Sequence, residues 1–140
     1  FNPFPFRKPY KLLIPLFIAI LGKIMELKGR VVIGLAEKIT IKGNGKAKTL
    51  LARVDTGATK SSIDTSLAKE IGLGPVITSK IIKSAHGSKL RPIVEADVVL
   101  AKKKMKAEFT LVERGHMKYR VLIGQNILKN GFIIDPLKTK

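Results

Sequence analysis

The chain has 140 residues, of which 45% are hydrophobic, and a formal net charge of +17 at pH 7. This length allows one domain with a modest core, and the hydrophobic content is typical of a folded chain rather than a disordered one. The absence of cysteine excludes disulfides, thiolate metal sites and a cysteine nucleophile. The excess of basic residues should attract anions such as nucleic acid, acidic lipids or Glu-rich peptides, but it is equally typical of a Lys-rich, heat-adapted surface.

Residues 1–24 differ from the rest of the chain. They contain no acidic residue, and their apolar run over residues 12–21 is interrupted by Pro15 and is far shorter than the roughly 20 residues that span a bilayer. We favour an over-extended gene start, with the native protein beginning at Met25; a weak membrane-surface anchor and a genuine extra segment are the alternatives. Residues 25–140 form the predicted domain, which we expect to be cytoplasmic unless residues 1–24 tether it to a membrane surface. They hold 23 of the 27 basic residues and all 10 acidic ones, which leaves a net charge of +13.

From Met25 onward, short β-rich segments alternate with turn signals. Strands are predicted at residues 30–41, 49–54, 76–83, 90–100, 106–113, 118–123 and 131–135. Asp64 is expected to cap a short helix over residues 64–70, and a single helical turn is expected at 125–129. Turns are predicted at 42–46 and 85–88, where Gly and Asn or Ser gather. Many short strands without a βαβ rhythm indicate an all-β barrel or sandwich.

The segment after the second predicted strand could carry chemistry. An apolar strand there leads directly into Asp55-Thr56-Gly57-Ala58. Gly57 allows a close backbone approach, and the Thr56 hydroxyl can fasten the turn by hydrogen bonding. By itself the Asp-Thr-Gly tripeptide is more often an ordinary strand-terminating turn, because Asp and Gly are common turn residues.

A second segment about 65 residues later adds weight to the first. There an apolar strand ends in Ile123-Gly124-Gln125-Asn126 and continues into the predicted helical turn. The order and spacing over residues 30–136 resemble the retropepsin-like aspartic protease family. Within it the chain is similar to the RimB-like group, also named ATP-dependent zinc proteases, whose Asp-Thr-Gly-Ala-x-x-Ser-Ser core and Gly-bearing flap followed by Arg-Pro resemble residues 55–62 and 84–92. The resemblance implies an all-β, retropepsin-like acid protease barrel with one or two short helices.

The resemblance also implies roles for particular residues. The catalytic residues are expected to be Asp55, Thr56 and Gly57. The flap, with a role in substrate binding, is expected at Ala85, His86 and Gly87, although an exposed turn residue is the preferred interpretation of His86. Structural support of the site is expected from Ala58, Ile123, Gly124 and Asn126. We predict no metal and no cofactor, because no His cluster and no Gly-Lys-Ser/Thr phosphate loop supports the zinc and ATP of the group's name.

The implied activity is peptide hydrolysis by two carboxylates that share one proton. The sequence contains one Asp-Thr-Gly, so a second Asp55 must come from a twofold-related copy, which predicts a homodimer. Thr59 and Gln125 replace an Asp and an Arg that retroviral proteases usually carry, so the dimer geometry and the substrate cleft of those enzymes do not transfer. The other acidic candidates, Asp64, Asp97 and Asp135, are interpreted as a helix cap, a strand-surface charge and a turn residue.

Two functions remain open at this stage. The first is an aspartic endopeptidase acting on a peptide or protein substrate. The resemblance suggests a Glu-rich substrate, because RimB-like proteins often accompany ATP-grasp ligases of the RimK type that add glutamates to protein tails. The second is a non-catalytic module of the same fold that binds an anionic partner such as RNA, a ribosome or an acidic protein tail. Two Tyr, six Phe and no Trp offer few stacking platforms, which argues against binding of single-stranded nucleic acid.

Overall fold

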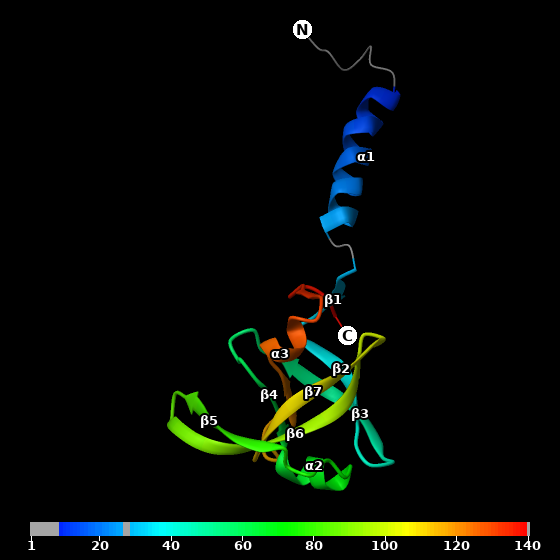
Figure 1. Ribbon diagram of the computed structural model, residues 1–140. Coiled ribbons are helices and arrows are strands. Elements are labelled where there is room, and N and C mark those ends of the chain that lie inside the picture. The colour runs from blue at the N-terminus through cyan, green and yellow to red at the C-terminus, as the bar shows by residue number, and fades with distance from the viewer. Residues whose placement is uncertain (1–8, 27–28, 140) are drawn as a thin grey trace. The chain divides into compact units, whose positions relative to one another are not determined.

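The computed structural model describes residues 9–26 and 29–139, which fall into two compact units that divide between Val31 and Val32 (Figure 1). The first unit contains the helix α1 (Pro9–Glu26), which continues through Pro15. Large apolar side chains between Leu13 and Leu21 are exposed on this helix. Among the helices in the described ranges, none combines the length and the apolar character needed to cross a membrane.

The second unit is built from strands with two short helices. The strands are β1 (Val31–Ile33), β2 (Ala36–Lys42), β3 (Ala47–Val54), β4 (Ser61–Asp64), β5 (Thr78–Ser84), β6 (Gly87–Leu100), β7 (Lys103–Val112), β8 (Val121–Ile123) and β9 (Phe132–Ile134); the helices are α2 (Thr65–Glu70) and α3 (Gln125–Leu128). One sheet has the order β2-β3-β8-β4-β7-β6-β5, and β2 also pairs with β6, so the sheet closes into a barrel. β1 and β9 form a separate two-stranded sheet. The predicted all-β barrel is confirmed.

The barrel interior is filled by side chains that alternate with outward-facing ones. In β6, Val94, Ala96, Val98 and Leu100 are buried, whereas Asp97 between them is exposed. This confirms the interpretation of Asp97 as a strand-surface charge. The core also takes in the aromatic ring of Phe109, isoleucines of β2, β4 and β8, and apolar residues of both short helices: Ile39, Ile41, Ile63, Ile123, Leu67 and Ile127.

Strand pairing brings together segments that are far apart in the sequence. β3 and β8 run parallel, with Arg53 opposite Leu122 and Val54 opposite Ile123. β4 lies between β8, to which it is antiparallel, and β7, to which it is parallel. Because β3 and β8 end side by side, the residues that follow each strand meet at one edge of the barrel. These residues are the Asp-Thr-Gly segment and Gly124.

β6 is a long strand that belongs to two structures. Its first half pairs with β5 in a hairpin that runs from Thr78 opposite Ile93 to Ser84 opposite Gly87, and its second half pairs with β7 and β2 in the barrel wall. The hairpin extends beyond the edge of the barrel (Figure 1). Its turn is followed by Gly87, whose φ of +105° is readily adopted only by glycine.

Three element predictions are corrected by the structure. Residues 30–41 form two strands rather than one, because the chain bends at Leu35. At the preceding Gly34, a Cβ would lie 2.7 Å from the carbonyl oxygen of Lys138. β8 begins at Val121 rather than at 118, because residues 114–117 form a turn in which Met117 N–H donates to the Arg114 carbonyl. β4 was not predicted at all. The helix cap was predicted correctly, since Asp64 accepts a hydrogen bond from Leu67 N–H at the start of α2.

Candidate active site

The loop after β3 holds Asp55 through its own backbone and through β8. The N–H of Asp55 donates to the carbonyl of Ile123 at 2.9 Å. The N–H of Gly57 donates to Oδ1 of Asp55 at 2.9 Å, and the N–H of Ala58 donates to the Asp55 carbonyl at 3.3 Å. The half-buried carboxylate is therefore fixed by a backbone donor two residues ahead, in an Asx-type turn. Asp55 sits at a strand end with a defined orientation, as the sequence predicts.

Helix α3 fastens this loop from the other side. Its first N–H groups, which have no partner inside a helix, donate to loop carbonyls: Gln125 N–H to Ala58 at 2.8 Å and Asn126 N–H to Thr59 at 3.2 Å. The carboxamide Nε2 of Gln125 donates to the Thr56 carbonyl at 2.8 Å. Among the described residues, Gln125 and Gly57 make the bonds that fasten this loop, and Thr56 is exposed, so the fastening role of the Thr56 hydroxyl stays a prediction.

Gly124 is required by the close approach of this loop. A Cβ at this position would lie 2.5 Å from the Lys60 carbonyl oxygen, 2.6 Å from the Lys60 carbonyl carbon and 2.9 Å from the Ala58 carbonyl oxygen. All three are backbone atoms, which cannot rotate away. The residue is glycine for lack of space rather than for its backbone dihedral, since its φ is −101°.

Asn126 joins the loop to the start of β4. Its Oδ1 accepts from the N–H of Ser61 at 2.8 Å and from the Ser61 hydroxyl at 2.7 Å, and its Nδ2 donates to the Glu108 carbonyl at 2.9 Å. The Ser61 hydroxyl in turn accepts from Gly124 N–H at 2.9 Å. Ser61 is fully buried, so the amide of Asn126 satisfies groups that water does not reach. The structure thus brings the predicted residues Ala58, Ile123, Gly124 and Asn126 together around the Asp55 loop.

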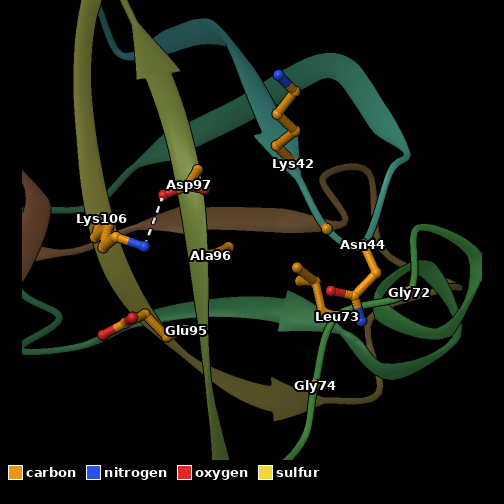
Figure 2. Close-up of a pocket in the computed structure, with 10 residues that line it drawn as sticks. Lys42, Asn44, Gly72, Leu73, Gly74, Glu95, Ala96, Asp97 and Lys106 are labelled. Carbon is orange, nitrogen blue, oxygen red and sulfur yellow. Dashed lines mark ion pairs between the residues drawn. The ribbon is translucent and has the colours of Figure 1, made fainter.

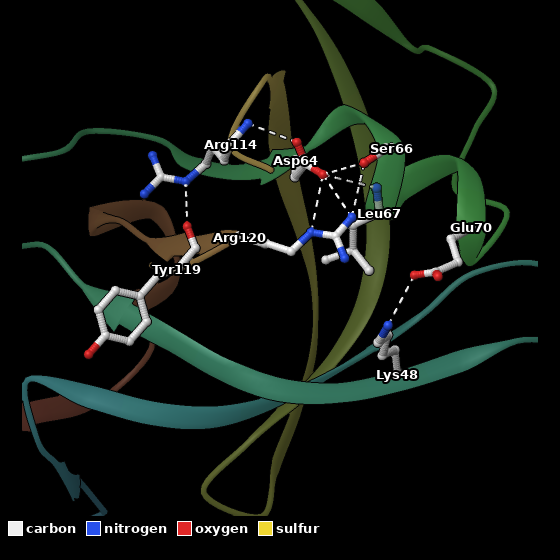
Figure 3. A network of polar contacts seen from close by, with 8 residues as sticks. All are labelled: Lys48, Asp64, Ser66, Leu67, Glu70, Arg114, Tyr119 and Arg120. Atoms are coloured by element: carbon white, nitrogen blue, oxygen red, sulfur yellow. Dashed lines mark hydrogen bonds and ion pairs between the residues drawn. The ribbon is translucent and has the colours of Figure 1, made fainter. Parts of the chain in front are cut away.

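A second polar network, at the other end of β4, was not predicted (Figure 3). Arg120 donates to Oδ2 of Asp64 from Nη2 at 2.8 Å and from Nε at 3.2 Å, and the N–H of Arg114 donates to Oδ1 at 2.8 Å. Burial raises the pKa of Asp64, but hydrogen bonds from Ser66, Arg114, Arg120 and Leu67 outweigh it, so the pKa lies well below its ordinary value. The sequence indicated one part of this network, Asp64 as the cap of helix α2.

Arg114 connects this network electrostatically to the Asp55 loop. Its Nε donates to the Tyr119 carbonyl at 3.0 Å, and the residue is 9% exposed. Burial and the nearby charge of Arg53 lower the pKa of the Arg114 guanidinium, while the carboxylates of Asp55 and Asp64 raise it, with a net lowering. Asp55 and Arg53 therefore lie within electrostatic range of the Arg114 guanidinium.

A cleft of about 460 Å³ adjoins the Asp55 loop. One wall is the segment from Ala58 to Lys60 with parts of β4, β7 and β8, and the other wall is residues 80–83 of β5. On the hairpin side, the lining therefore comes from β5 rather than from the turn between β5 and β6. The predicted flap residues Ala85, His86 and Gly87 lie at the hairpin tip and are not among the lining residues.

A smaller hollow of about 110 Å³ lies elsewhere on the barrel, between the turns after β2 and α2 and the strand β6 (Figure 2). Its walls include Lys42, Asn44 and Glu95, and an ion pair of 3.3 Å joins Asp97 to Lys106 at its rim. None of the predicted site residues lines this hollow. Within residues 9–26 and 29–139, no group of three His, Cys, Asp or Glu side chains is arranged to hold a metal ion.

Solved structures share this architecture. A Legionella pneumophila protein of unknown function is 20% identical with a TM-score of 0.55, over 78% of this chain and 95% of that one. The simian foamy virus protease is 21% identical with a TM-score of 0.51, over 67% and 91%. The EIAV protease, solved with the inhibitor HBY-793, is 16% identical with a TM-score of 0.56, over 68% and 85%. The barrel is therefore a retropepsin-like protease fold, as the sequence predicts.

The sequence narrows this class to a family. Residues 67–140 match the family model described as RimB-like, retropepsin-like aspartic endopeptidase RimB. Because that match covers more than half of the chain, the protein belongs to the RimB-like family of retropepsin-like aspartic endopeptidases. The matched range includes Gly124 and Asn126, whereas Asp55 lies before it.

A curated relative carries a different name. A protein of Desulfotalea psychrophila named "Probable alpha-L-glutamate ligase" is 38% identical over 63 residues, which are 44% of this chain. The chain spans only 14% of the length of that protein.

Proposed function

We propose that the chain is one subunit of a homodimeric aspartic endopeptidase, in which Asp55 of each subunit supplies one carboxylate of the catalytic pair. The observation that carries this proposal is the fixed position of Asp55 at the end of β3. Hydrogen bonds from Gly57 and to Ile123 hold it there, and the neighbouring Thr56 and Gly57 remain exposed. The family membership and the retropepsin-like fold support the same conclusion.

The proposed mechanism requires both carboxylates. Two like charges about 3 Å apart cannot both ionise, so the pair shares one proton. The ionised carboxylate takes a proton from a water molecule that attacks the scissile carbonyl carbon, and the protonated one donates to the carbonyl oxygen. Collapse of this intermediate breaks the C–N bond as the nitrogen takes up a proton. The chain has one Asp-Thr-Gly, which is why the second Asp55 must come from a twofold-related copy.

We further propose that the substrate is an acidic peptide or protein tail, acted on in connection with an ATP-grasp glutamate ligase. The support is the net charge of +17, the Arg53 and Arg114 side chains near Asp55, and the resemblance of part of the chain to a protein named as a glutamate ligase. Residues Ala85, His86 and Gly87 at the hairpin tip are proposed to close over the bound peptide.

The proposal is tested with Asp55→Asn and the matched control Asp97→Asn, which removes an exposed carboxylate on the barrel wall. Both are assayed with a Glu-rich peptide and a neutral peptide of the same length. We expect Asp55→Asn to abolish cleavage and Asp97→Asn to retain it, with a dimer in sedimentation velocity. Equal activity of wild type and Asp55→Asn, or a strict monomer that cleaves, would overturn the proposal. Salt-sensitive binding of the acidic peptide without cleavage would favour the non-catalytic module instead.

A further inference from the structure

The cleft beside the Asp55 loop has an uneven distribution of charge. Its lining residues include Lys60 from the loop and Lys80 and Lys83 from β5, together with apolar side chains such as Ile82 and Leu122. No carboxylate is among these lining residues. Both walls of the cleft therefore contribute lysines, next to apolar side chains.

Glu108, which is not a lining residue of the cleft, has its carboxylate near two of these lysines. Oε1 of Glu108, on β7, lies 3.8 Å from Nζ of Lys60 and 3.7 Å from Nζ of Lys80. The backbone carbonyl of the same residue accepts the hydrogen bond from Asn126, so Glu108 is anchored to the site. Oε1 of Glu108 thus contacts both Lys60, which follows the Asp55 loop, and Lys80 of β5.

These contacts are loose. Both distances exceed the 2.7–3.2 Å of N–H···O hydrogen bonds, so neither ammonium group donates a hydrogen bond to Glu108. Each lysine retains three N–H donors that a second carboxylate could engage at shorter range. Both lysines and Glu108 are only partly buried, with side-chain exposures of 30%, 45% and 36%, which leaves them accessible to a ligand. In the part of the chain that the structure describes, Lys83 makes no ion pair.

We propose that Lys60 and Lys80 form a subsite for an acidic side chain of the substrate, and that Glu108 partly occupies this subsite until the substrate carboxylate displaces it. Three lysines line the cleft, and among the described residues Glu108 supplies the carboxylate within 4 Å of two of them, with Glu95 as its cross-strand neighbour, so an acidic side chain in the cleft itself would meet an excess of positive charge. Lys60 lies two residues after Ala58, which lines the same cleft, whereas Asp55 itself does not line it. The inference rests on the proposed function, because it names the substrate chemistry of the same site.

The experiment measures binding rather than turnover, so that it does not depend on catalysis. Asp55→Asn protein is titrated into a fluorescently labelled Glu-rich peptide and into a Gln-rich peptide of the same length. Lys80→Met and Lys60→Met should each weaken binding of the Glu-rich peptide about tenfold, as expected for one charge-assisted hydrogen bond. Glu108→Gln, which keeps the size and the backbone, should tighten it. Binding of the Gln-rich peptide should not change in any variant.

The matched control is the ion pair between Lys48 and Glu70, 3.1 Å long and exposed on the barrel surface. Lys48→Met and Glu70→Gln change the net charge by the same amounts as Lys80→Met and Glu108→Gln, and they should leave both affinities unchanged. If Lys48→Met weakens binding as much as Lys80→Met, the attraction is a general field and the subsite is refuted. Weaker or unaltered binding by Glu108→Gln refutes the displacement of Glu108.

The outcome is separable from that of the proposed function. If the wild type cleaves no peptide while the Lys60 and Lys80 variants lose affinity selectively, the peptidase proposal fails and the subsite stands. If the wild type cleaves the Glu-rich and Gln-rich peptides equally well and the lysine variants do the same, the subsite fails and the peptidase stands. Urea unfolding of each variant checks that the loss of binding does not reflect a loss of fold.

Discussion

Replacing Asn126 by Ala should release the start of β4 from helix α3, while the bonds from α3 to the Asp55 loop, made by Gln125 and by the Asn126 N–H, remain. The Asn126 amide makes three hydrogen bonds, two accepted from Ser61 at 2.8 and 2.7 Å and one donated to the Glu108 carbonyl at 2.9 Å. The variant removes all of them at once. The alanine itself is well tolerated in a helix, so its propensity does not add to the cost.

The magnitude follows from what the truncation leaves behind. The Ser61 N–H loses its acceptor in a residue that is fully buried, and the Glu108 carbonyl loses its donor at a half-buried position. A buried donor or acceptor without a partner costs about 1–3 kcal/mol. The Ser61 hydroxyl can rotate towards another acceptor, and water can reach the Glu108 carbonyl, so we expect a loss of about 3 kcal/mol in the free energy of unfolding.

Urea unfolding followed by far-UV circular dichroism measures this loss, because the chain lacks tryptophan. The matched control is Asn130→Ala in the residues just after the same helix. The Asn130 amide donates to the carbonyls of Asn126 and Ile127 at 3.0 and 3.1 Å, near solvent, so its removal should cost less than about 1 kcal/mol. If Asn126→Ala is no less stable than Asn130→Ala, the Asn126 amide does not hold the start of β4 and the reasoning is refuted.

Two further variants test the ends of β4. Asp64→Asn should lower the free energy of unfolding by about 3 kcal/mol at pH 7, as for one partner removed from a buried pair. Hydrogen bonds outweigh burial and lower the pKa of Asp64 from 3.8. The carboxylate therefore stabilises the fold above pH 3.8, and this stabilisation is lost as the pH falls through the lowered pKa. A difference between wild type and variant that stays the same down to strong acid in urea titrations would contradict this. Gly124→Ala should cost about 3 kcal/mol through overpacking against the Lys60 and Ala58 carbonyls and should lower activity with it; a variant as stable as wild type would show that the loop yields.

The order of elements was readable from the sequence because local signals suffice for it. β-branched runs, glycine turns and a capping Asp each act within a few residues, and together they placed most strands, both short helices and the Asp55 loop correctly. The pairing of the Asp-Thr-Gly segment with Ile123-Gly124-Gln125-Asn126 was also anticipated, through the family resemblance rather than through local physics. The contact of Gly124 with the Lys60 carbonyl gives that pairing its physical reason.

Features that depend on distant partners were missed. β4 reads Ser-Ser-Ile-Asp, a polar string with no strand pattern, yet all four residues are buried. Their polar groups are satisfied by Asn126, Arg114 and Arg120, which lie 50 or more residues further along the chain. The Lys60–Glu108–Lys80 contacts are missed for the same reason. Nothing near a residue in sequence reveals which distant side chain will face it.

The bracing of β4 at both ends has a consequence for how such a protein can change over evolutionary time. Anchors at Ser61 and Asp64 hold the strand, and Asp55, Gly57 and Ala58 are held through their backbones. Between Ala58 and Ser61, the side chains of Thr59 and Lys60 take no part in these anchoring bonds, and both line the cleft. Mutations there can alter which ligand is preferred without loosening the framework. Positions 59 and 60 therefore lie between anchored residues of the ten-residue segment 55–64, which makes them suitable positions to diversify the protein by directed evolution.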